Sequence, residues 1–422
     1  MRRRLFIQSG PAAVAVALSG CGGGGSVDSA TAATGADAAA TSLLTTAGST
    51  QAAPLSLQSA PSSPQSAAPS PQEAVASASP ATGPFKVGLN LHTNGATLSQ
   101  NTQIAAILQA RNFRRIRMDY FWDQDQALAR DLITKINGYG GSVEMSLQIS
   151  YQWDHTVSAD LAAVQSNAYR QTYAAVNAMK DLVHDFELLN EVQLRPEILA
   201  AVPWNSAGTS KSPYQNKPAL ANLAAILRGM ANAVHDLAAS SGLPLRVIMG
   251  VIGRDFGFLS YLQDEGVQWD VTGYHVYPSE GNAPLQTDSW YGAGGPLAQL
   301  ASFGKPVTLN EFNAGEIYNV GYENVQGQPL TEQGFRSYAK HMLELYSQTL
   351  CKLESVVLYE LLDEPSKPAP ENHFGLMFDL GTPKVSLYLA TALAGGTLSS
   401  AERTALTSRG LLTAAQIDAM QR

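Results

Sequence analysis

Eight short apolar runs, each followed by a loop and a pattern typical of a helix, lie between Lys86 and Pro365. Strands that alternate with helices form parallel sheets, because each crossover helix returns the chain to the same edge. Eight such units within about 300 residues are typical of a closed barrel. The sequence therefore predicts an α/β fold, a (β/α)8 TIM barrel. The eight predicted strands are 87–92, 113–122, 142–150, 186–191, 246–253, 271–278, 306–312 and 355–365.

An open, doubly wound sheet is the alternative arrangement of the same elements. Its nucleotide-binding form carries Gly-x-Gly-x-x-Gly after the first strand, and this chain has neither that motif nor a phosphate-binding loop. The closed barrel is therefore favoured. We expect the strands to be apolar inside the barrel and to end in polar groups at its top.

The first 20 residues have the features of an export signal. Arg3 and Arg4 begin a segment that resembles a twin-arginine signal, and the apolar stretch Ala12–Leu18 that follows is too short to span a bilayer. Leu18-Ser19-Gly20-Cys21 resembles a lipoprotein lipobox. This predicts that Cys21 carries lipid and anchors an exported protein to a bacterial membrane, with the outer membrane or cell surface favoured, facing the periplasm or the exterior. A cleaved signal with an accidental cysteine is the alternative.

Residues 21–83 are predicted to form a disordered tether. They are mostly Ala, Ser, Thr, Pro and Gly, without Lys, Arg or aromatic residues, and so cannot bury enough apolar surface to fold. Residues 84–396 are predicted to form the barrel domain. Residues 397–422 are predicted to form a helical C-terminal tail, with Thr413 as an N-cap and a packing or association role.

Charge and cysteine content exclude some classes of function. From residue 84 onward, 32 Asp and Glu face 24 Lys and Arg, with no basic run, so nucleic acid is not an expected partner. Cys351 is the second of only two cysteines, and no His or Cys cluster has metal-ligand spacing. The sequence predicts neither a metal site nor a cofactor.

Two of the predicted strands end in Asn-Glu. The run FELLNE places Asn190 and Glu191 after an apolar stretch, and PVTLNE places Asn310 and Glu311 in the same way 120 residues later. In barrels of this kind, catalytic groups lie at the carboxyl ends of strands. Two glutamates there are suited to glycoside hydrolysis, in which one acid protonates the leaving oxygen and one carboxylate attacks or stabilises the anomeric carbon.

The set of strand ends resembles glycoside hydrolase clan A over roughly Phe85 to Ala394, with most likeness to families 39 and 5. The resemblance implies a retaining enzyme with Glu191 as general acid/base and Glu311 as nucleophile. It also implies that the substrate contacts Asn190, at the sugar 2-hydroxyl, together with Arg117, His275 and Tyr277. The strand-eight tryptophan frequent in family 5 is absent, and Tyr359 or Glu360 takes its place.

Other polar and aromatic side chains at the predicted barrel top are candidate sugar contacts, because sugar rings pack on flat side chains. The candidates are His92, Trp122, Trp153, Tyr359 and Glu360. The first hypothesis is a retaining glycosidase that cleaves a polysaccharide internally, with bacterial exopolysaccharide as one candidate. The alternatives are a non-catalytic carbohydrate-binding or secretion-scaffold lipoprotein, and a transglycosylase in polysaccharide biosynthesis.

Overall fold

The computed structural model describes residues 85–92, 97–121, 126–149, 157–204, 206, 208–277, 285, 289–313, 332–367 and 371–421. Within these residues, eight parallel strands pair in chain order and close into a barrel when β1 pairs with β8. The predicted TIM barrel is confirmed. The strands are β1 (Lys86–Leu91), β2 (Arg115–Phe121), β3 (Ser142–Gln148), β4 (Asp185–Leu188), β5 (Arg246–Ile252), β6 (Val271–Val276), β7 (Val307–Phe312) and β8 (Leu353–Leu358).

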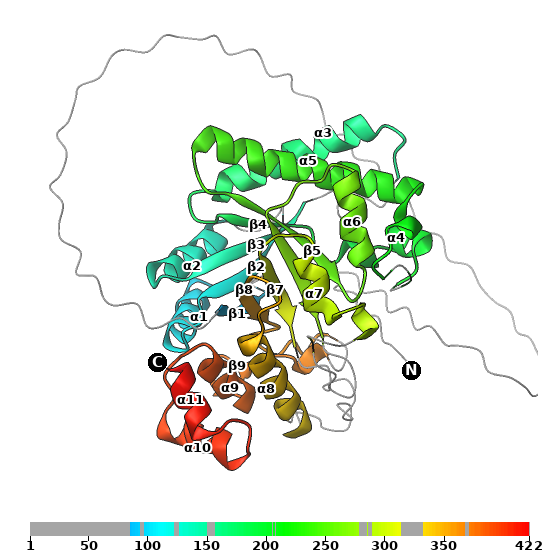
Figure 1. The fold of residues 1–422 in the computed structure, drawn as a ribbon. Helices are drawn as coiled ribbons and strands as arrows, with labels where there is room; N and C mark the ends of the chain where they lie inside the picture. Colours follow the sequence, from blue (N-terminus) through cyan, green and yellow to red (C-terminus); the bar gives the residue numbers. More distant parts are fainter. Residues whose placement is uncertain are drawn as a thin grey trace, which may run out of the picture. The chain divides into compact units, whose positions relative to one another are not determined.

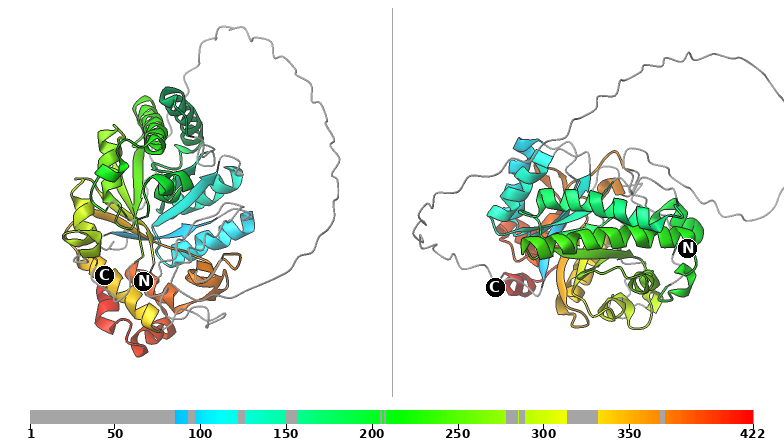
Figure 2. Two further views of the ribbon diagram at one scale, coloured as in Figure 1. Left: turned by 90° about the vertical axis from the view of Figure 1, so that its right-hand side faces the viewer. Right: turned by 90° about the horizontal axis from the view of Figure 1, so that it is seen from above.

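Helices surround the barrel and cover the apolar outer face of its strands (Figure 1). The two long helices α3 and α5 lie side by side across one flank (Figure 2). Their contact includes hydrogen bonds from Tyr169 to Asp236 and from Arg228 to Gln165. The helices between the strands are α1 (Leu98–Ala110), α2 (Gln126–Gly138), α3 (Leu161–Met179), α4 (Pro196–Ala201), α5 (Pro218–Ser241), α6 (Phe256–Asp264), α7 (Gly295–Ala301) and α8 (Glu332–Ser347).

The inside of the barrel is polar well below its mouth, which corrects the expectation of an apolar interior. Side chains alternate across a strand, so on β2 the residues Ile116 and Met118 contact the apolar core while Arg115 and Arg117 face the other way. All four are at most 5% exposed. The strands are apolar in composition because their outer residues pack on helices, and the sequence run does not show which face each residue takes.

An ion-pair network fills the lower part of the barrel. Arg115 on β2 contacts Glu144 on β3 at 2.9 Å and also pairs with Asp185 on β4. Arg246 at the start of β5 contacts Asp185 at 2.7 Å and Glu354 on β8 at 2.9 Å. Buried charges are tolerated when they are paired, and each charge of this network has a partner of opposite sign.

The C-terminal part begins with a small hairpin of β9 (Met377–Asp379) and β10 (Thr382–Pro383), followed by α9 (Val385–Leu393), α10 (Ser400–Ser408) and α11 (Ala414–Met420). In Figure 1, α9, α10 and α11 lie together beside α8. The side chains of Leu406, Leu412 and Ile417 are at most 2% exposed. Thr413 is the N-cap of α11, as predicted, and accepts a hydrogen bond from the Gln416 amide. The tail helices therefore have a packing role.

Candidate active site

Glu191 reaches the barrel mouth through a sharp change of backbone direction. Strand β4 ends at Leu188, three residues before the end of the predicted strand. Leu189 and Glu191 then have φ angles of 61° and 42°, in the left-handed region that non-glycine residues seldom adopt. A short 3-10 helix (Val192–Leu194) follows at once. Sparsely populated backbone conformations of this kind concentrate at functional sites, where the surrounding structure holds them in place.

Glu311 lies within β7 and is 2% exposed. Its Oε1 accepts a hydrogen bond from Arg117 Nη1 at 2.9 Å, and its Oε2 accepts one from the Tyr277 hydroxyl at 2.8 Å. His275, its register partner on β6, places Nδ1 3.3 Å from Oε2. Two hydrogen-bond donors and a neighbouring imidazole therefore surround the Glu311 carboxyl group.

Glu191 has different surroundings. Its Oε1 lies 3.0 Å from His275 Nδ1, and its side chain is 15% exposed. Burial raises the pKa of Glu191; the contact with His275 lowers it, and the negative charge of Glu311 raises it, so that the pKa lies above the usual range of a glutamate. An oxygen of Glu191 and an oxygen of Glu311 lie within 4.8 Å of each other. The two glutamates thus face each other as an acid that tends to keep its proton and a carboxylate held by donors.

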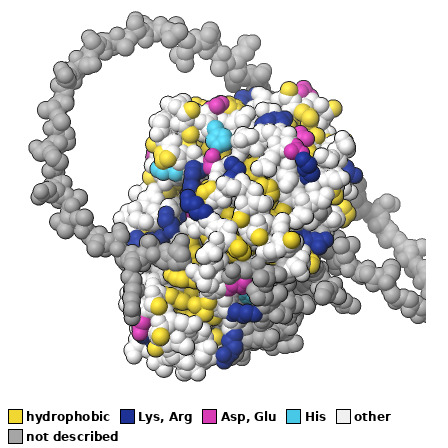
Figure 3. Space-filling model, viewed as in Figure 1, with side chains coloured by type: hydrophobic (Ala, Val, Ile, Leu, Met, Phe, Trp, Pro, Cys, Tyr) yellow, Lys and Arg dark blue, Asp and Glu magenta, His cyan; other side chains and the backbone are white. Residues whose placement is uncertain are grey.

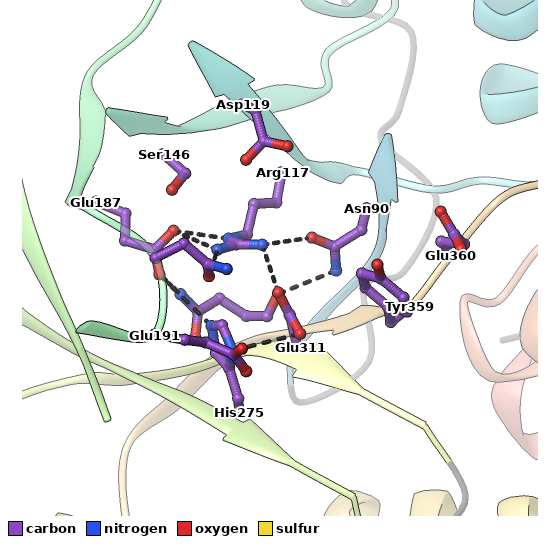
Figure 4. A network of polar contacts seen from close by, with 12 residues as sticks. Asn90, Arg117, Asp119, Ser146, Glu187, Glu191, His275, Glu311, Tyr359 and Glu360 are labelled. Atoms are coloured by element: carbon purple, nitrogen blue, oxygen red, sulfur yellow. Dashed lines mark hydrogen bonds and ion pairs between the residues drawn. The ribbon is translucent and has the colours of Figure 1, made fainter. Parts of the chain in front are cut away.

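Arg117 is the hub of this site (Figure 4). Besides Glu311, its guanidinium donates to Glu187 at 2.7 Å, to Asn90 at 2.9 Å and to Asn190 at 2.7 Å. Asn190 is 8% exposed, and its carbonyl oxygen accepts that bond from Arg117. The five residues come from β1, β2, β4, the turn after β4 and β7, so only the closed barrel brings them together.

Glu187 and Asn310 form a buried layer beneath the two glutamates. Glu187 is fully buried, and its Oε1 accepts a hydrogen bond from Asn310 Nδ2 at 2.7 Å. Glycines on the neighbouring strands leave room for this pair. A Cβ atom on Gly250 would lie 3.1 Å from Glu187 Oε1, and one on Gly273 would lie 2.9 Å from Asn310 Nδ2. This layer therefore depends on the absence of side chains at those two positions.

His275 contacts carboxylates through both ring nitrogens. Nδ1 faces Glu191 and Glu311, and Nε2 lies 3.5 Å from Glu187 Oε1. Burial disfavours its charge, but the charge of Glu311 and the contacts with Glu187 and Glu191 raise the pKa of His275 to about 10. At neutral pH the ring is therefore an imidazolium that is hydrogen-bonded to Glu191 through Nδ1 and forms a longer ion pair with Glu187 through Nε2.

A second cluster lies at the ends of β1 and β8. His92 Nδ1 lies 2.9 Å from Asp119 Oδ2, and its Nε2 lies 3.5 Å from Glu360 Oε2. Burial lowers the pKa of His92, but the hydrogen bond and charge of Asp119 outweigh it and raise the pKa to about 9. Tyr359 is 2% exposed, and its hydroxyl accepts a hydrogen bond from Lys367 at 2.5 Å. In Figure 4, Glu360 lies on the far side of Tyr359 from Glu311.

A cavity of about 210 Å³ adjoins this second cluster, and its lining comes from β1, α1 and the chain after β8. The lining residues are Asn90, Leu91, His92, Ile104, Glu360, Leu361, Leu362, Asp363 and Glu364. Both apolar and charged side chains thus line the cavity.

Two groups of side chains in the described part of the chain are close enough to hold a metal ion: His92 with Glu360 and Glu364, and His275 with Glu191 and Glu311. Metal ligation requires a neutral imidazole. The raised pKa values of His92 and His275 keep both rings protonated at neutral pH, and both are engaged with carboxylates. These groups fit ion pairing better than metal binding.

The predicted site residues divide into three sets. Glu191, Glu311, Asn190, Arg117, His275 and Tyr277 are brought into one connected cluster. His92, Tyr359 and Glu360 lie in the neighbouring cluster. Trp122, Trp153 and Cys21 lie outside the described residues.

The sequence interpretation missed Asn90 and Glu187, and it named Asn310 without assigning it a role. Each is a polar residue inside an apolar strand, and that exception to the pattern was the available signal. Asn310 and Glu187 belong to the same two motifs that identified the glutamates.

Basic and acidic side chains are interspersed on the visible face of the molecule. Over the face drawn in Figure 3, basic side chains stand singly or in small groups among acidic and neutral ones. None of the helices in the described ranges is long and apolar enough to cross a membrane.

Three solved structures that are similar to this chain are described as glycosidases. A glucosidase from Croceicoccus marinus aligns over 69% of this chain and 63% of its own length, with 11% identity and a TM-score of 0.46. A GH39 β-xylosidase from Caulobacter crescentus covers 75% of this chain and 73% of its own, with 16% identity and a TM-score of 0.45. A GH5-4 broad-specificity endoglucanase from Clostridium longisporum covers 75% and 98%, with 13% identity and a TM-score of 0.49.

The matched region thus spans less than two thirds of the Croceicoccus protein. No protein-family model and no curated protein sequence matches the chain. At these identities the likenesses carry no conclusion about activity, which has to be argued from the side chains.

Proposed function

We propose that this protein is a retaining glycoside hydrolase that cleaves a polysaccharide internally, with Glu311 as nucleophile and Glu191 as general acid/base. The observation that carries the proposal is the contrast between the two glutamates. Their oxygens lie within 4.8 Å, yet burial raises the pKa of Glu191 while Glu311 accepts hydrogen bonds from Arg117 and Tyr277. Paired carboxyls in opposite environments are what acid/base and nucleophile roles require.

In the first step, a Glu311 oxygen attacks the anomeric carbon as the bond from that carbon to the leaving oxygen breaks. Glu191 gives its proton to the leaving oxygen, and a glycosyl ester of Glu311 forms. In the second step, water attacks the anomeric carbon while Glu191 takes a proton from that water. The ester bond breaks and returns the Glu311 carboxylate.

The short separation supports double displacement. Retaining enzymes have carboxyl groups about 5 to 5.5 Å apart, whereas inverting enzymes need roughly 6.5 to 9.5 Å to admit a water.

The charge on Glu191 also has to change during the cycle. When Glu311 becomes an ester it loses its negative charge, so the pKa of Glu191 falls and the residue is ready to act as a base.

The decisive experiment incubates the full chain with a panel of α-linked and β-linked polysaccharides, bacterial exopolysaccharides included, and analyses the products. The comparison variants are Glu311→Gln and Glu354→Gln. Glu354 lies at the start of β8, at the opposite end of the barrel, where it pairs with Arg246 and Lys352. It therefore serves as a matched control.

We expect oligosaccharides from the unmutated protein and from Glu354→Gln, with none from Glu311→Gln, and a first-formed product that retains the anomeric configuration of the substrate. An inverted product would refute the nucleophile assignment. Products longer than the substrate would identify a transglycosylase. Glycan binding without any product, in all three proteins, would identify a carbohydrate-binding scaffold.

A further inference from the structure

Below the two proposed catalytic glutamates, the structure places a third carboxyl group that is buried inside the barrel. Glu187 on β4 is fully buried. It accepts hydrogen bonds from Arg117 Nε and Asn310 Nδ2, both at 2.7 Å, and its Oε1 lies 3.5 Å from His275 Nε2. Arg117 and His275 are the two cations that contact Glu311, and His275 also contacts Glu191. Glu187 is therefore hydrogen-bonded to Arg117 and forms an ion pair with His275, the two cations that contact the proposed catalytic pair.

We propose that Glu187 is a positioning residue that keeps His275 doubly protonated, so that His275 always presents an Nδ1–H group to Glu191 and Glu311. The inference rests on the proposed function, because it assigns Glu187 a role in tuning the acid/base of that reaction. It does not make Glu187 a catalytic residue, since its contacts run through Arg117, Asn310 and His275.

The geometry explains why a carboxylate is needed at this position. A neutral imidazole carries one N–H and one bare nitrogen, so it could satisfy either Glu187 or the upper glutamates, but not both. In this site Nε2 is buried and lies 3.5 Å from Glu187 Oε1, an ion-pair contact and not a hydrogen bond, while Nδ1 faces Glu191 at 3.0 Å and Glu311 at 3.3 Å. Carboxylates on both sides favour the imidazolium.

The groups that face His275 come from three other strands and from the turn after β4. They are Glu187 on β4, Glu191 after β4, Glu311 on β7 and Arg117 on β2. Burial and the Arg117 charge oppose the imidazolium, whereas the charge of Glu311 and the contacts with Glu187 and Glu191 favour it. Replacing Glu187 with glutamine removes one of these three and leaves an amide that can accept a hydrogen bond but holds no charge.

The consequence for Glu191 has a definite sign. If Glu187→Gln lets His275 lose its proton, Glu191 loses a positive charge at 3.0 Å, while the negative charge that disappears belongs to the deeper Glu187. The nearer change dominates, so the pKa of Glu191 rises and the alkaline limb of the rate profile moves to higher pH. If His275 stays charged, the only change near Glu191 is the lost negative charge of Glu187. The pKa of Glu191 then falls, and the alkaline limb of the rate profile moves to lower pH.

The first measurement is an NMR titration of 15N-labelled histidine in the full chain, with His275 assigned by its absence in His275→Asn. It needs no substrate, so it tests Glu187 whether or not the protein proves to be a glycosidase. We expect the pKa of His275 to fall by about 1 to 3 units in Glu187→Gln. An unchanged His275 titration would overturn the proposal.

Glu144→Gln is the matched control. Glu144 is also fully buried, lies one layer lower on β3 and contacts Arg115 at 2.9 Å and Arg117 at 3.9 Å. Its substitution removes the same charge from the same barrel interior, and we expect the His275 titration to stay close to that of the unmutated protein. An equal shift in Glu144→Gln would refute a specific role for Glu187.

The second measurement is the pH dependence of kcat and KM on a substrate identified as above. We expect kcat to fall by roughly 10- to 100-fold in Glu187→Gln with KM nearly unchanged, and the alkaline limb to move to higher pH. A purely structural role would lower the fraction of folded enzyme and leave the profile in place. A limb that moves to lower pH would overturn the proposal.

If Glu187→Gln does not fold, Glu187→Asp takes its place in both measurements. Aspartate keeps the charge that Arg117 requires, but the shorter side chain withdraws the carboxylate from His275 Nε2. We expect the pKa of His275 and the alkaline limb of the rate profile to shift in the same directions as in Glu187→Gln, but by smaller amounts. An aspartate variant that folds and titrates like the unmutated protein would count against the inference.

Discussion

Arg117→Met tests whether buried charge pairing holds the active site together. Methionine keeps much of the side-chain length and removes the guanidinium, which donates to Asn90, Glu187, Asn190 and Glu311. The arginine is 2% exposed. Among the described residues, the cation left within 4 Å of Glu187 or Glu311 is His275. The variant therefore keeps two buried carboxylates that have lost their strongest partner.

Removing one member of a buried ion pair costs about 3 to 5 kcal/mol, because the remaining charge stays out of water. We expect a loss of that size in the free energy of unfolding at pH 7. Arg130→Met is the matched control. Its arginine is 37% exposed and pairs with Asp181, which is 56% exposed. Exposed pairs contribute about 0 to 1 kcal/mol.

The assay is urea unfolding followed by circular dichroism at neutral and acidic pH. Burial alone would raise the pKa of Glu187, but the contacts with Arg117 and His275 together outweigh burial and lower it. A carboxyl with a lowered folded-state pKa contributes stability above its unfolded pKa of about 4.3, and this stability is lost as the pH falls through the folded value. The difference in the free energy of unfolding between the unmutated protein and Arg117→Met should therefore become smaller below about pH 4.

Two results would refute this reasoning. If the free energy of unfolding at pH 7 fell no more in Arg117→Met than in Arg130→Met, charge pairing would not be what stabilises the residues around Arg117. A loss of the expected size that stays constant from pH 7 to pH 3 would mean that the ionisation of Glu187 has no part in it.

Two other predictions concern the acid/base and the anchor. Glu191→Ala should lower kcat/KM by about 10²- to 10⁴-fold on substrates with sugar leaving groups, and much less on nitrophenyl glycosides, whose leaving group departs without protonation. Both substrate types are measured in parallel assays. Equal losses of kcat/KM on both would contradict the role of Glu191. We also propose that the full chain is exported and lipid-anchored through Cys21, so Cys21→Ser should move it from the membrane fraction to the soluble fraction of expressing cells, and an unchanged distribution would exclude lipidation at Cys21.

The eight strands were predictable because β-strand pattern and spacing are local properties of the chain. Each predicted run overlaps the strand it named, from β1 at Lys86–Leu91 to β8 at Leu353–Leu358. The error at strand four had a local cause. Apart from Glu187, FELLNE is apolar as far as Leu189, and the hydrophobicity pattern does not reveal the left-handed turn at Leu189 and Glu191.

The two catalytic candidates were predictable for a related reason. In a parallel barrel, every strand delivers its carboxyl end to the same rim, so Glu191 and Glu311 had to approach each other once the barrel was recognised. Their chemical difference was not predictable. The hydrogen bonds of Arg117 and Tyr277 to Glu311, and the burial of Glu191, are contacts between strands far apart in sequence.

The sequence by itself determined the barrel, the rim on which the site lies and the identity of the two glutamates, because hydrophobic periodicity and the residues at strand ends are local features of the sequence. Only the tertiary structure decided what lies beneath them. The side chains of β2, β3, β4 and β7 turn their charged groups inward, and whether Glu187 meets Arg117, Asn310 and His275 depends on strand register and on the space left by Gly250 and Gly273. Burial and charge pairing arise from neighbours in space, and those neighbours set the protonation on which the proposed chemistry depends.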